Sequence, residues 1–315
     1  MHILILGSSQ TLNRMSGDRM SIDTNCVDKK VNVKKRSQWN DVWKRLKRNR
    51  MAMVGLFILI ILVGVSIFAD FIADYDTVVI KQDIANRLQT PSSEHWFGTD
   101  EYGRDIFARI IHGTRISLYA GLITVGIGLI VGGALGAIAG YYGGKLDSVI
   151  MRTLDIFLAL PNILLAMAIV AAFGSSNINL LIAIGVANVP KFARILRASV
   201  ITLKDQEFIE SSIAIGAKNY TIIMHHIIPN CIAPIIVQST LRVAFAILSI
   251  SGLSFLGIGI QQPTPEWGSM LSSGRSFIRD SSHIALFPGF AIMITILALN
   301  LLGDGLRDAL DPRLK

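Results

Sequence analysis

Cysteine is scarce in this chain, and charged residues are too few for an ordinary soluble domain. The 315 residues include two cysteines, Cys26 and Cys231, which show neither the dense spacing of a disulfide framework nor the paired spacing of a zinc site. Charged residues make up 17% of the chain, against about 25% in soluble domains. Because 51% of the residues are apolar, the composition is that of a membrane protein, and we interpret both cysteines as incidental.

No phosphate-binding loop or catalytic constellation is visible. In the stretch GYYGGKLD, Ala139 stands where a P-loop needs glycine, and Leu146 stands where it needs serine or threonine. Three acids, Asp100, Glu101 and Asp105, lie together in FGTDEYGRD, where acids could act in acid–base chemistry or bind a cation. The arginines and turn-like glycines in and beside this stretch indicate a folded loop instead. We expect no nucleotide site, no catalytic residue and no cofactor, with cation binding as the weaker alternative.

Metal-binding and ion-coupling patterns are also missing. His225 and His226 are adjacent, so on a helix their side chains point about 100° apart and cannot bind one metal from one face. Asp155 and Arg242 are the ionisable residues that qualify as intramembrane, and such residues mark ion-coupled carriers. Two such residues are weak evidence for an ion-coupled carrier. From the histidine spacing we expect no metal site.

Long apolar runs are the main feature that is present. A helix needs about 20 apolar residues to cross a hydrocarbon core of about 30 Å. Six runs qualify, at 51–69, 116–140, 154–173, 178–197, 234–256 and 284–303. The fourth is the weakest, because it reaches full length only if Lys191 and Arg194 extend toward the membrane surface. The sequence predicts an all-α polytopic membrane protein with six transmembrane helices.

Basic residues set the orientation, because lysine and arginine are retained on the cytoplasmic side. With the N-terminus inside, the inner segments hold 22 of the 30 basic residues and the outer segments hold 7. This asymmetry predicts an N-in, C-in topology. The run KRLKRNR, which abuts the first apolar run, is explained by anionic lipid, so we expect no nucleic-acid partner.

The spans and basic segments together predict how the chain is organised. The expected parts are a disordered cytoplasmic tail at 1–38, a basic anchor and first helix at 39–69, an outer loop at 70–115, a core at 116–303 that includes an inner segment at 191–233 and an outer loop at 257–283, and a cytoplasmic tail at 304–315.

Glycines recur every four residues in the second run. Gly128, Gly132, Gly136 and Gly140 fall on one helix face and would let another backbone approach closely. Ordinary helix packing explains them better than contact with a substrate. The sequence names no substrate-binding residue.

The polar segment EFIESSIAIGAKNYTIIMHHIIP separates the fourth and fifth runs. Counted from Lys191, this connection has about 40 residues, whereas helix connections usually have fewer than about 8. Its apolar residues recur every three or four positions, which predicts an amphipathic helix; they are Phe208, Ile209, Ile213, Ala217 and Tyr220. Gly216 predicts a bend and Pro229 an end to the second helical stretch. Such a helix pair on the inner side is suited to docking a partner.

Residues Glu210 through Pro229 follow the pattern E-S-S-x3-G-x12-P, which resembles the EAA motif of permease subunits of bacterial ABC importers. Further stretches resemble the second, C-type permease of dipeptide and oligopeptide importers. They are HWFGTDEYGRDIFARIIHGTRISL, AGYYGGKLDSVIMRTLDIFLALP, GLSFLGIGIQQPTPEWGSML, LNLLGDGLRDALDPRLK and WKRLKRNRMAMVGLFIL. The resemblance covers about residues 39–315.

The resemblance implies the permease fold of type I ABC importers in the bacterial inner membrane. It also implies four kinds of partner: a homologous second permease that forms a heterodimer with this chain, two cytoplasmic ABC ATPases, an extracytoplasmic substrate-binding protein and the lipid membrane. ATP hydrolysis would belong to the ATPases, so this chain would not be an enzyme.

The EAA-like segment would be the coupling helix that enters a cleft of the ATPase. The resemblance gives Glu210 a contact with a basic group there, lets Ser211 and Ser212 permit close approach, and makes Gly216 the bend. Ala217 and Pro229 complete the matched positions. The two serines replace the alanines of the motif, which is a small change at a docking surface.

The substrate stays open at this stage, because members of the family import dipeptides, oligopeptides, glutathione, nickel or sugars. Histidines or carboxylates inside a span would favour nickel, so their scarcity mildly favours peptides. Two rival classes are a self-sufficient secondary carrier, which would transport without ATP, and a scaffold protein, whose uptake would survive changes at Glu210 or Gly216.

Overall fold

The computed structural model describes residues 38–311, and most of them are helical. The long helices are α2 (Arg50–Ile67), α4 (Ile106–Tyr142), α7 (Asn177–Lys204), α11 (Ile232–Phe255) and α13 (His283–Leu310). The shorter elements are α1 (Gln38–Arg48), α3 (Ala69–Ile72), η2 (Tyr75–Val79), η3 (Ile84–Asn86), α5 (Gly144–Ala159), α6 (Asn162–Phe173), α8 (Glu207–Ala214), α9 (Asn219–Thr221), η4 (Ile222–Ile227), α10 (Ile228–Asn230), α12 (Trp267–Gly274) and η5 (Arg275–Phe277). Residues 1–37 and 312–315 of the two expected tails lie outside the described residues. Residues 304–310 of the expected C-terminal tail belong instead to α13.

Polar side chains fix the starts of three long helices. The side-chain oxygen of Asn49 accepts a hydrogen bond from the backbone N–H of the third residue of α2, at 3.2 Å. Asp105 does the same for α4 at 2.8 Å, and Ser176 for α7 at 3.1 Å. These caps satisfy backbone donors that have no partner inside the helix.

Helix α4 starts ten residues before the predicted second span. The expected loop at 70–115 therefore ends at Asp105, and the residues after it are already helical. At 37 residues the helix is about 55 Å long, which exceeds the hydrocarbon core of about 30 Å, so it projects beyond the membrane. The apolar run marks the membrane-embedded part of this helix, whereas the Asp105 cap marks its start.

The predicted third span, 154–173, is not one helix. It is divided between α5 and α6, which meet at an angle of 91°. The break falls at Leu160, which has extended backbone angles, and at Pro161, whose ψ of 131° is also non-helical. A residue before proline is disfavoured in helical conformation, which explains why α5 ends there.

The four glycines of α4 lie against α7. A Cβ atom at Gly128 would lie 2.9 Å from Asn188, and one at Gly140 would lie 2.9 Å from the carbonyl oxygen of Arg197. At Gly136 a Cβ would overlap the carbonyl oxygen of Ala193. The contacts advance along both helices in the same direction, so α4 and α7 run parallel. The α5–α6 pair must then carry the chain back across, and we count it as the third crossing.

Helices α2 and α13 pack in opposite directions. A Cβ at Gly55 would lie 2.6 Å from the carbonyl oxygen of Ala298, whereas Gly305 faces Ala52. Arg45 of α1 donates a hydrogen bond to the carbonyl oxygen that follows α13, at 3.3 Å. The described chain thus starts and ends on the same side, which requires an even number of crossings. Five helices are long and apolar enough to span a membrane, and the bent pair makes the sixth.

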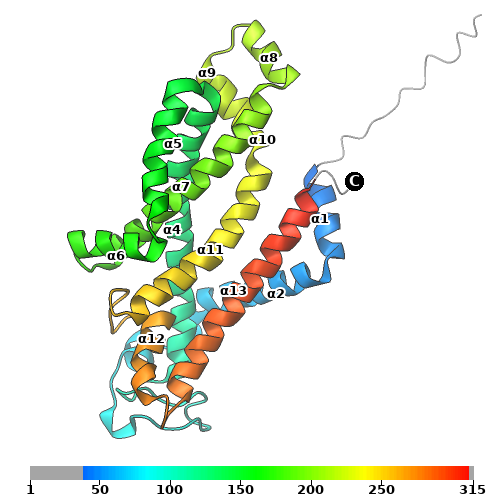
Figure 1. Cartoon of the computed structure of the whole chain (residues 1–315). Coiled ribbons are helices and arrows are strands. Elements are labelled where there is room, and N and C mark those ends of the chain that lie inside the picture. Colours follow the sequence, from blue (N-terminus) through cyan, green and yellow to red (C-terminus); the bar gives the residue numbers. More distant parts are fainter. Residues whose placement is uncertain (1–37, 312–315) are drawn as a thin grey trace, which may run out of the picture. The chain divides into compact units, whose positions relative to one another are not determined.

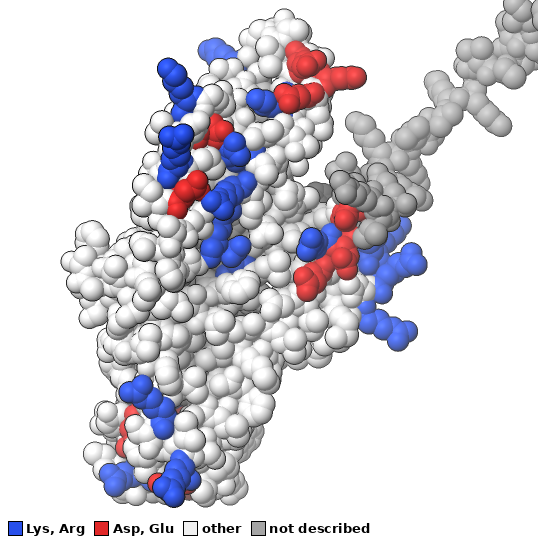
Figure 2. Space-filling view, in the orientation of Figure 1, with Lys and Arg blue, Asp and Glu red and all other residues white. Residues whose placement is uncertain are grey.

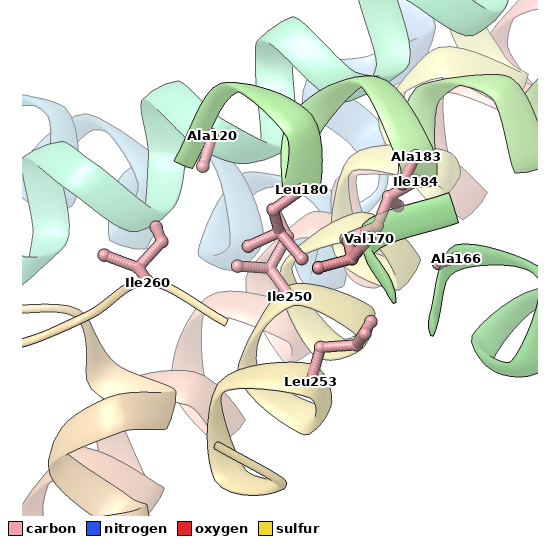
Figure 3. Close-up of a cluster of buried hydrophobic side chains, with 9 residues drawn as sticks. All are labelled: Ala120, Ala166, Val170, Leu180, Ala183, Ile184, Ile250, Leu253 and Ile260. Carbon is pink, nitrogen blue, oxygen red and sulfur yellow. The ribbon is translucent and has the colours of Figure 1, made fainter. Parts of the chain in front are cut away.

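An apolar core joins α4, α6, α7 and α11, as Figure 3 shows. Its buried members are Ala120, Ala166, Val170, Leu180, Ala183, Ile184, Ile250, Leu253 and Ile260. In Figure 1 the segment α8–α10 lies at one end of the long helices, and α12 with the loop before α4 lies at the other. Figure 2 shows charged side chains gathered toward these ends, with an uncharged band between them on this face. That pattern is expected of a surface in contact with lipid.

Candidate functional site

The polar segment between α7 and α11 is mostly helical, as its periodicity predicts. Asp205 ends α7, and α8, α9, η4 and α10 follow before α11 begins (Figure 1). The segment lies at the same side of the bundle as the basic ends of α1 and α13, which the count of lysine and arginine places inside the cell.

Apolar side chains anchor this segment on the ends of α4 and α7. The buried members of the cluster are Ala137, Leu196, Val200, Ile209, Ile222, Ile227 and Cys231. Tyr141 of α4 adds a polar tie, because its hydroxyl donates to the side-chain oxygen of Asn219 at 2.9 Å. A force applied to the segment would be transmitted to these two transmembrane helices, since the interface is packed rather than fluid.

The outer face of α8 combines acids with exposed apolar side chains. Glu207, Glu210 and Ser211 are exposed, and Ile213 is exposed on the same short helix. Ile215, just past its end, is 85% exposed. Apolar side chains gathered on an aqueous surface mark an interaction site, and the acids would favour a basic partner.

The two serines of the motif are bound to their own helix. The Ser211 hydroxyl donates to the carbonyl oxygen of Glu207 at 2.8 Å, and the Ser212 hydroxyl donates to that of Phe208 at 2.7 Å. Ser211 lies on the exposed face and Ser212 on the buried face. Of the two, therefore, Ser211 is the serine placed to meet a partner.

Gly216 forms the bend that the sequence predicts. Its φ angle is +81°, in the left-handed region, and no atom would lie within 4 Å of a Cβ added there. The backbone N–H of Gly216 donates to the carbonyl oxygen of Ile213 at 2.9 Å, and that of Ala217 donates to the carbonyl of Ser212 at 3.1 Å. Glycine commonly ends helices in this way because other residues are strained at such angles. The half-buried Ala217 then packs into the apolar anchor.

Pro229 does not end a helix, and this prediction is wrong. It lies in the first turn of α10, and helical turns continue through Cys231 into α11. Proline is tolerated in a first turn because the N–H that it lacks would have no helical partner there. The preceding segment η4 is π-helical, so the α-helical hydrogen-bond pattern begins again at α10, where Pro229 lies in the first turn.

The adjacent histidines lie in η4. His225 is exposed and His226 is half-buried. Asn230 donates a side-chain hydrogen bond to the backbone carbonyl oxygen of His226 at 2.5 Å. Across residues 38–311, no group of three or more histidine, cysteine or acidic side chains is placed to hold a metal ion.

Ion pairs join α5 to α7 beside the segment. Arg197 donates two hydrogen bonds to Asp147, at 2.5 and 2.6 Å. Asp155, which the sequence marks as intramembrane, pairs with Arg194 at 2.6 Å on the exposed surface. The Asp147–Arg197 pair was missed by sequence reasoning, because its members are 50 positions apart and no local pattern links them.

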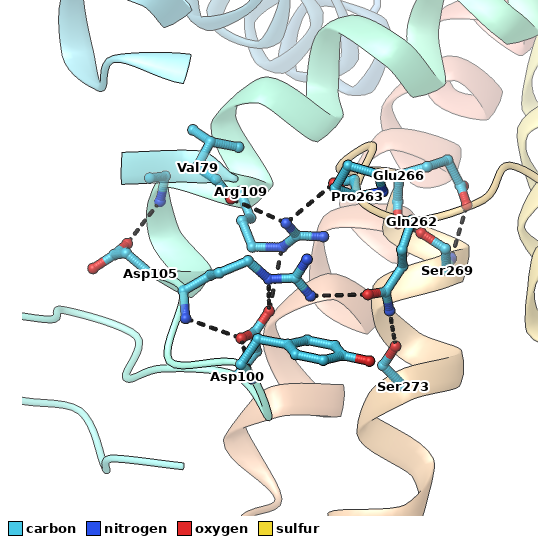
Figure 4. Close-up of polar contacts among 12 residues, drawn as sticks. Val79, Asp100, Asp105, Arg109, Gln262, Pro263, Glu266, Ser269 and Ser273 are labelled. Carbon is cyan, nitrogen blue, oxygen red and sulfur yellow. Dashed lines mark hydrogen bonds and ion pairs between the residues drawn. The ribbon is translucent and has the colours of Figure 1, made fainter. Parts of the chain in front are cut away.

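A second polar cluster, drawn in Figure 4, lies at the outer end. Asp100 accepts a hydrogen bond from Arg104 at 2.7 Å, and Arg104 also donates to the side chain of Gln262 at 3.0 Å. Gln262 donates in turn to Ser273. Arg109 donates to the carbonyl oxygen of Val79, the last residue of η2, at 3.0 Å and to that of Pro263, before α12, at 3.3 Å. These bonds tie the two outer loops together.

The acids that the sequence groups in FGTDEYGRD therefore act separately. Asp100 is neutralised by Arg104, with a further contact to Arg109 at 3.5 Å. Asp105 caps α4 with one oxygen, and its other oxygen lies 2.8 Å from Nδ1 of His95. Both arrangements are structural, and they leave these carboxylates without the shared geometry of a cation site.

Glu266 is a buried acid that the sequence reasoning did not single out. Its carboxylate accepts hydrogen bonds from the backbone N–H groups of Gly268 at 2.9 Å and Ser269 at 2.8 Å, and from the Ser251 hydroxyl at 3.2 Å. Burial raises the pKa of Glu266, while these hydrogen bonds act in the opposite direction. The stretch PEWGSML did carry a signal, because an acid just before a helix is a capping pattern.

Comparison with known proteins identifies the family. Residues 132–315 match "Binding-protein-dependent transport system inner membrane component", and residues 37–91 match "N-terminal TM domain of oligopeptide transport permease C". The chain is 52% identical over 279 residues to the dipeptide transport system permease protein DppC of Alkalihalophilus pseudofirmus, which covers 89% of this chain and 91% of the relative.

Two further relatives are glutathione transport system permease proteins GsiD. The one from Escherichia coli is 48% identical over 280 residues, covering 89% of this chain and 92% of the relative. The one from Pectobacterium atrosepticum is 45% identical over 282 residues, covering 89% and 93%. The chain therefore belongs to the family of binding-protein-dependent transport system inner membrane components, the permeases of ABC importers, and is a multi-pass protein of the inner membrane.

Proposed function

We propose that this chain is one of two permease subunits of an ATP-driven importer of dipeptides or oligopeptides. Its partners would be a homologous second permease, two cytoplasmic ABC ATPases and an extracytoplasmic binding protein that delivers the peptide. The chain itself would carry out no catalysis. The observation that carries the proposal is the segment α8–α10, with an exposed acid and apolar face that is anchored on α4 and α7.

The segment is suited to act as a lever. The exposed Glu210 would pair with a basic group of an ATPase, and Ser211 would allow the surfaces to approach closely. When the ATPases dimerise on ATP, the segment would move with them. The buried apolar side chains of the segment pack against α4 and α7. The motion would therefore tilt both helices and switch access from one side of the membrane to the other.

A peptide substrate is supported by the relatives, which are named for dipeptide and glutathione transport. Both ligands are short peptides with free carboxylates. The dipeptide relative has the higher identity of the two, so a dipeptide or oligopeptide is the favoured substrate and glutathione is the alternative. Nickel, the other substrate weighed, would be tested by uptake of the radioactive ion.

The proposal is tested by reconstituting the complete complex in proteoliposomes and measuring ATP-driven uptake of a radiolabelled dipeptide. Glu210→Ala and Gly216→Pro should each lower uptake by about tenfold or more, because a lost charged contact or a broken bend uncouples the segment. Asp308→Ala is the matched control, since Asp308 is an exposed acid on the inner end of α13, outside the segment.

Three results would contradict the proposal. The first is a purified complex with fewer than two ATPases per permease pair. Uptake by the Glu210→Ala and Gly216→Pro variants could match that of Asp308→Ala, which would favour a scaffold. Transport by the permease alone without ATP would instead support a secondary carrier.

A further inference from the structure

Two basic side chains lie on transmembrane helices, one at the inner part of its apolar run and one within its run. Lys191 is on α7 and Arg242 is on α11, and both are half-buried. The guanidinium of Arg242 lies over the ring of Phe245, and Phe245 lines the same cavity as Lys191, so the two positive charges are neighbours. Bringing two like charges together in a low-dielectric region is unfavourable unless an anion lies nearby.

Neither side chain forms an ion pair with a carboxylate anywhere in residues 38–311. The guanidinium of Arg242 lies over the ring of Phe245, 5.7 Å from its centre. Other arginines on or beside the transmembrane helices do have acidic partners, and these pairs are Arg104 with Asp100, Arg115 with Asp70, Arg194 with Asp155 and Arg197 with Asp147. Lys191 and Arg242 thus form a half-buried cationic pair without a carboxylate partner in residues 38–311, unlike these four arginines.

A cavity opens beside the cationic pair. It has a volume of about 60 Å³ and lies between α6, α7 and α11. Its polar lining comes from Lys191, Asn162, Asn188 and Ser249, and Phe245 contributes an aromatic wall. This volume is about that of two water molecules, enough for a carboxylate group.

Arg242 continues the same surface along α11. Arg242, Phe245 and Ser249 are spaced by three and four residues, so they share one face of the helix. Phe245 is 57% exposed and Leu248, next to it, is 51% exposed, so other parts of this chain leave the face largely open. A substrate moving between this chain and a second permease could therefore reach it.

We propose that Lys191 and Arg242 bind the carboxylate of a peptide as it crosses the membrane. This inference rests on the proposed function. A carboxylate supplies the missing negative charge, and the side-chain amides of Asn162 and Asn188 in the cavity lining can donate hydrogen bonds to it. A lipid phosphate is a poorer fit, because Arg242 lies inside the predicted fifth run (234–256) rather than at its end near the headgroups.

The test compares two substrates in proteoliposomes that contain the complete importer. Each is supplied as saturated binding protein, one loaded with dialanine and the other with dialanine amide, which lacks the carboxylate charge. In the Lys191→Gln/Arg242→Gln double variant, uptake of dialanine should fall by about tenfold or more, while uptake of the amide should change by less than about twofold. Arg242→Lys keeps the charge and should restore at least about half of the uptake.

Arg194→Gln is the matched control, because Arg194 lies one turn from Lys191 but is paired with Asp155. It should leave the ratio of dialanine to amide uptake unchanged. The inference is overturned if the double variant imports dialanine as the wild type does, or if it loses both substrates by the same factor. It is also overturned if the variant complex fails to assemble on size-exclusion chromatography, since Arg242 would then pair with an acid of the second permease.

Failure of the proposed function would look different. In that case the wild-type complex would import neither substrate, and the inference would fall with it. Import by the wild type together with an unchanged double variant would instead leave the permease assignment intact and remove only the carboxylate site.

Discussion

Arg197 and Asp147 form a two-bond ion pair, with Nε to Oδ1 at 2.5 Å and Nη2 to Oδ2 at 2.6 Å, that joins α7 to α5. Two parallel hydrogen bonds fix both the distance and the angle between the groups. Arg197 also supplies the carbonyl oxygen that faces Gly140 of α4. Arg197 of α7 thereby contacts both α4 and α5 at the inner end, close to the anchored segment.

Replacing Asp147 by asparagine should destabilise the α5–α7 contact modestly. Both side chains are partly exposed, so the loss should be about 0.5–1 kcal/mol. Arg197→Lys should cost a similar amount, because lysine cannot form the paired bonds. Thermal unfolding of the purified protein in detergent measures both. In the double variant Asp147→Asn/Arg197→Lys, the loss of unfolding free energy should differ from the sum of the two single losses, because the two residues interact. A loss equal to that sum would contradict the pairing.

The glycine face of α4 makes a sharper prediction. In Gly136→Ala the added Cβ would overlap the backbone of Ala193, and a backbone cannot move aside as a flexible side chain can. We expect a loss of about 1–3 kcal/mol in unfolding free energy, measured in a detergent titration. Gly126→Ala is the control, because no atom lies within 4 Å of a Cβ there. A neutral Gly136→Ala would show that α4 and α7 can separate without cost.

Much of the fold follows from local patterns. The apolar runs locate the membrane-embedded parts of α2, α4, α7, α11 and α13, because burial in lipid needs nothing beyond composition and length. The bend at Gly216 also follows from one residue, since few others adopt its φ of +81°. Features that depend on a single element are those that a sequence specifies most directly.

Features that depend on distant contacts were harder to predict. The run 154–173 is apolar apart from Asp155 and Asn162, so hydropathy does not reveal the 91° turn at Pro161. Pro229 is also a proline, but it lies in the first turn of α10. The π-helical segment η4 before it ends the earlier α-helical hydrogen-bond pattern. Pairing of Asp147 with Arg197 requires that α5 pack beside α7, which no stretch of sequence states by itself. The coupling role of Glu210 stays a prediction for the same reason, since its partner lies on another chain.

Glu266 should give the protein a pH-dependent stability. Its folded pKa is raised by burial above the ordinary value of 4.5. An acid whose pKa is raised by folding binds more protons in the folded state than in the unfolded state. Its contribution to stability is therefore complete below about pH 4.5 and is lost as the pH rises through the folded pKa. Glu266→Gln should lack this decline. The check is the melting temperature of both proteins between acidic and neutral pH, and parallel curves would contradict the prediction.

Cys231 should resist thiol reagents until the inner segment opens. It is fully buried at the start of α11, and burial raises the pKa of its thiol to about 11. The thiolate is the reactive form, so both access and ionisation disfavour the reaction at neutral pH. In a Cys26→Ser background, which leaves Cys231 as the remaining cysteine of the chain, labelling by N-ethylmaleimide should be slow in the native protein and complete in denaturant. Gly216→Pro, which strains the bend beside the anchor, should speed labelling, whereas Asp308→Ala should not. Rapid labelling of the native Cys26→Ser protein would mean that the apolar anchor between the segment and α4 and α7 opens readily, and a loose anchor could not transmit the motion of an ATPase.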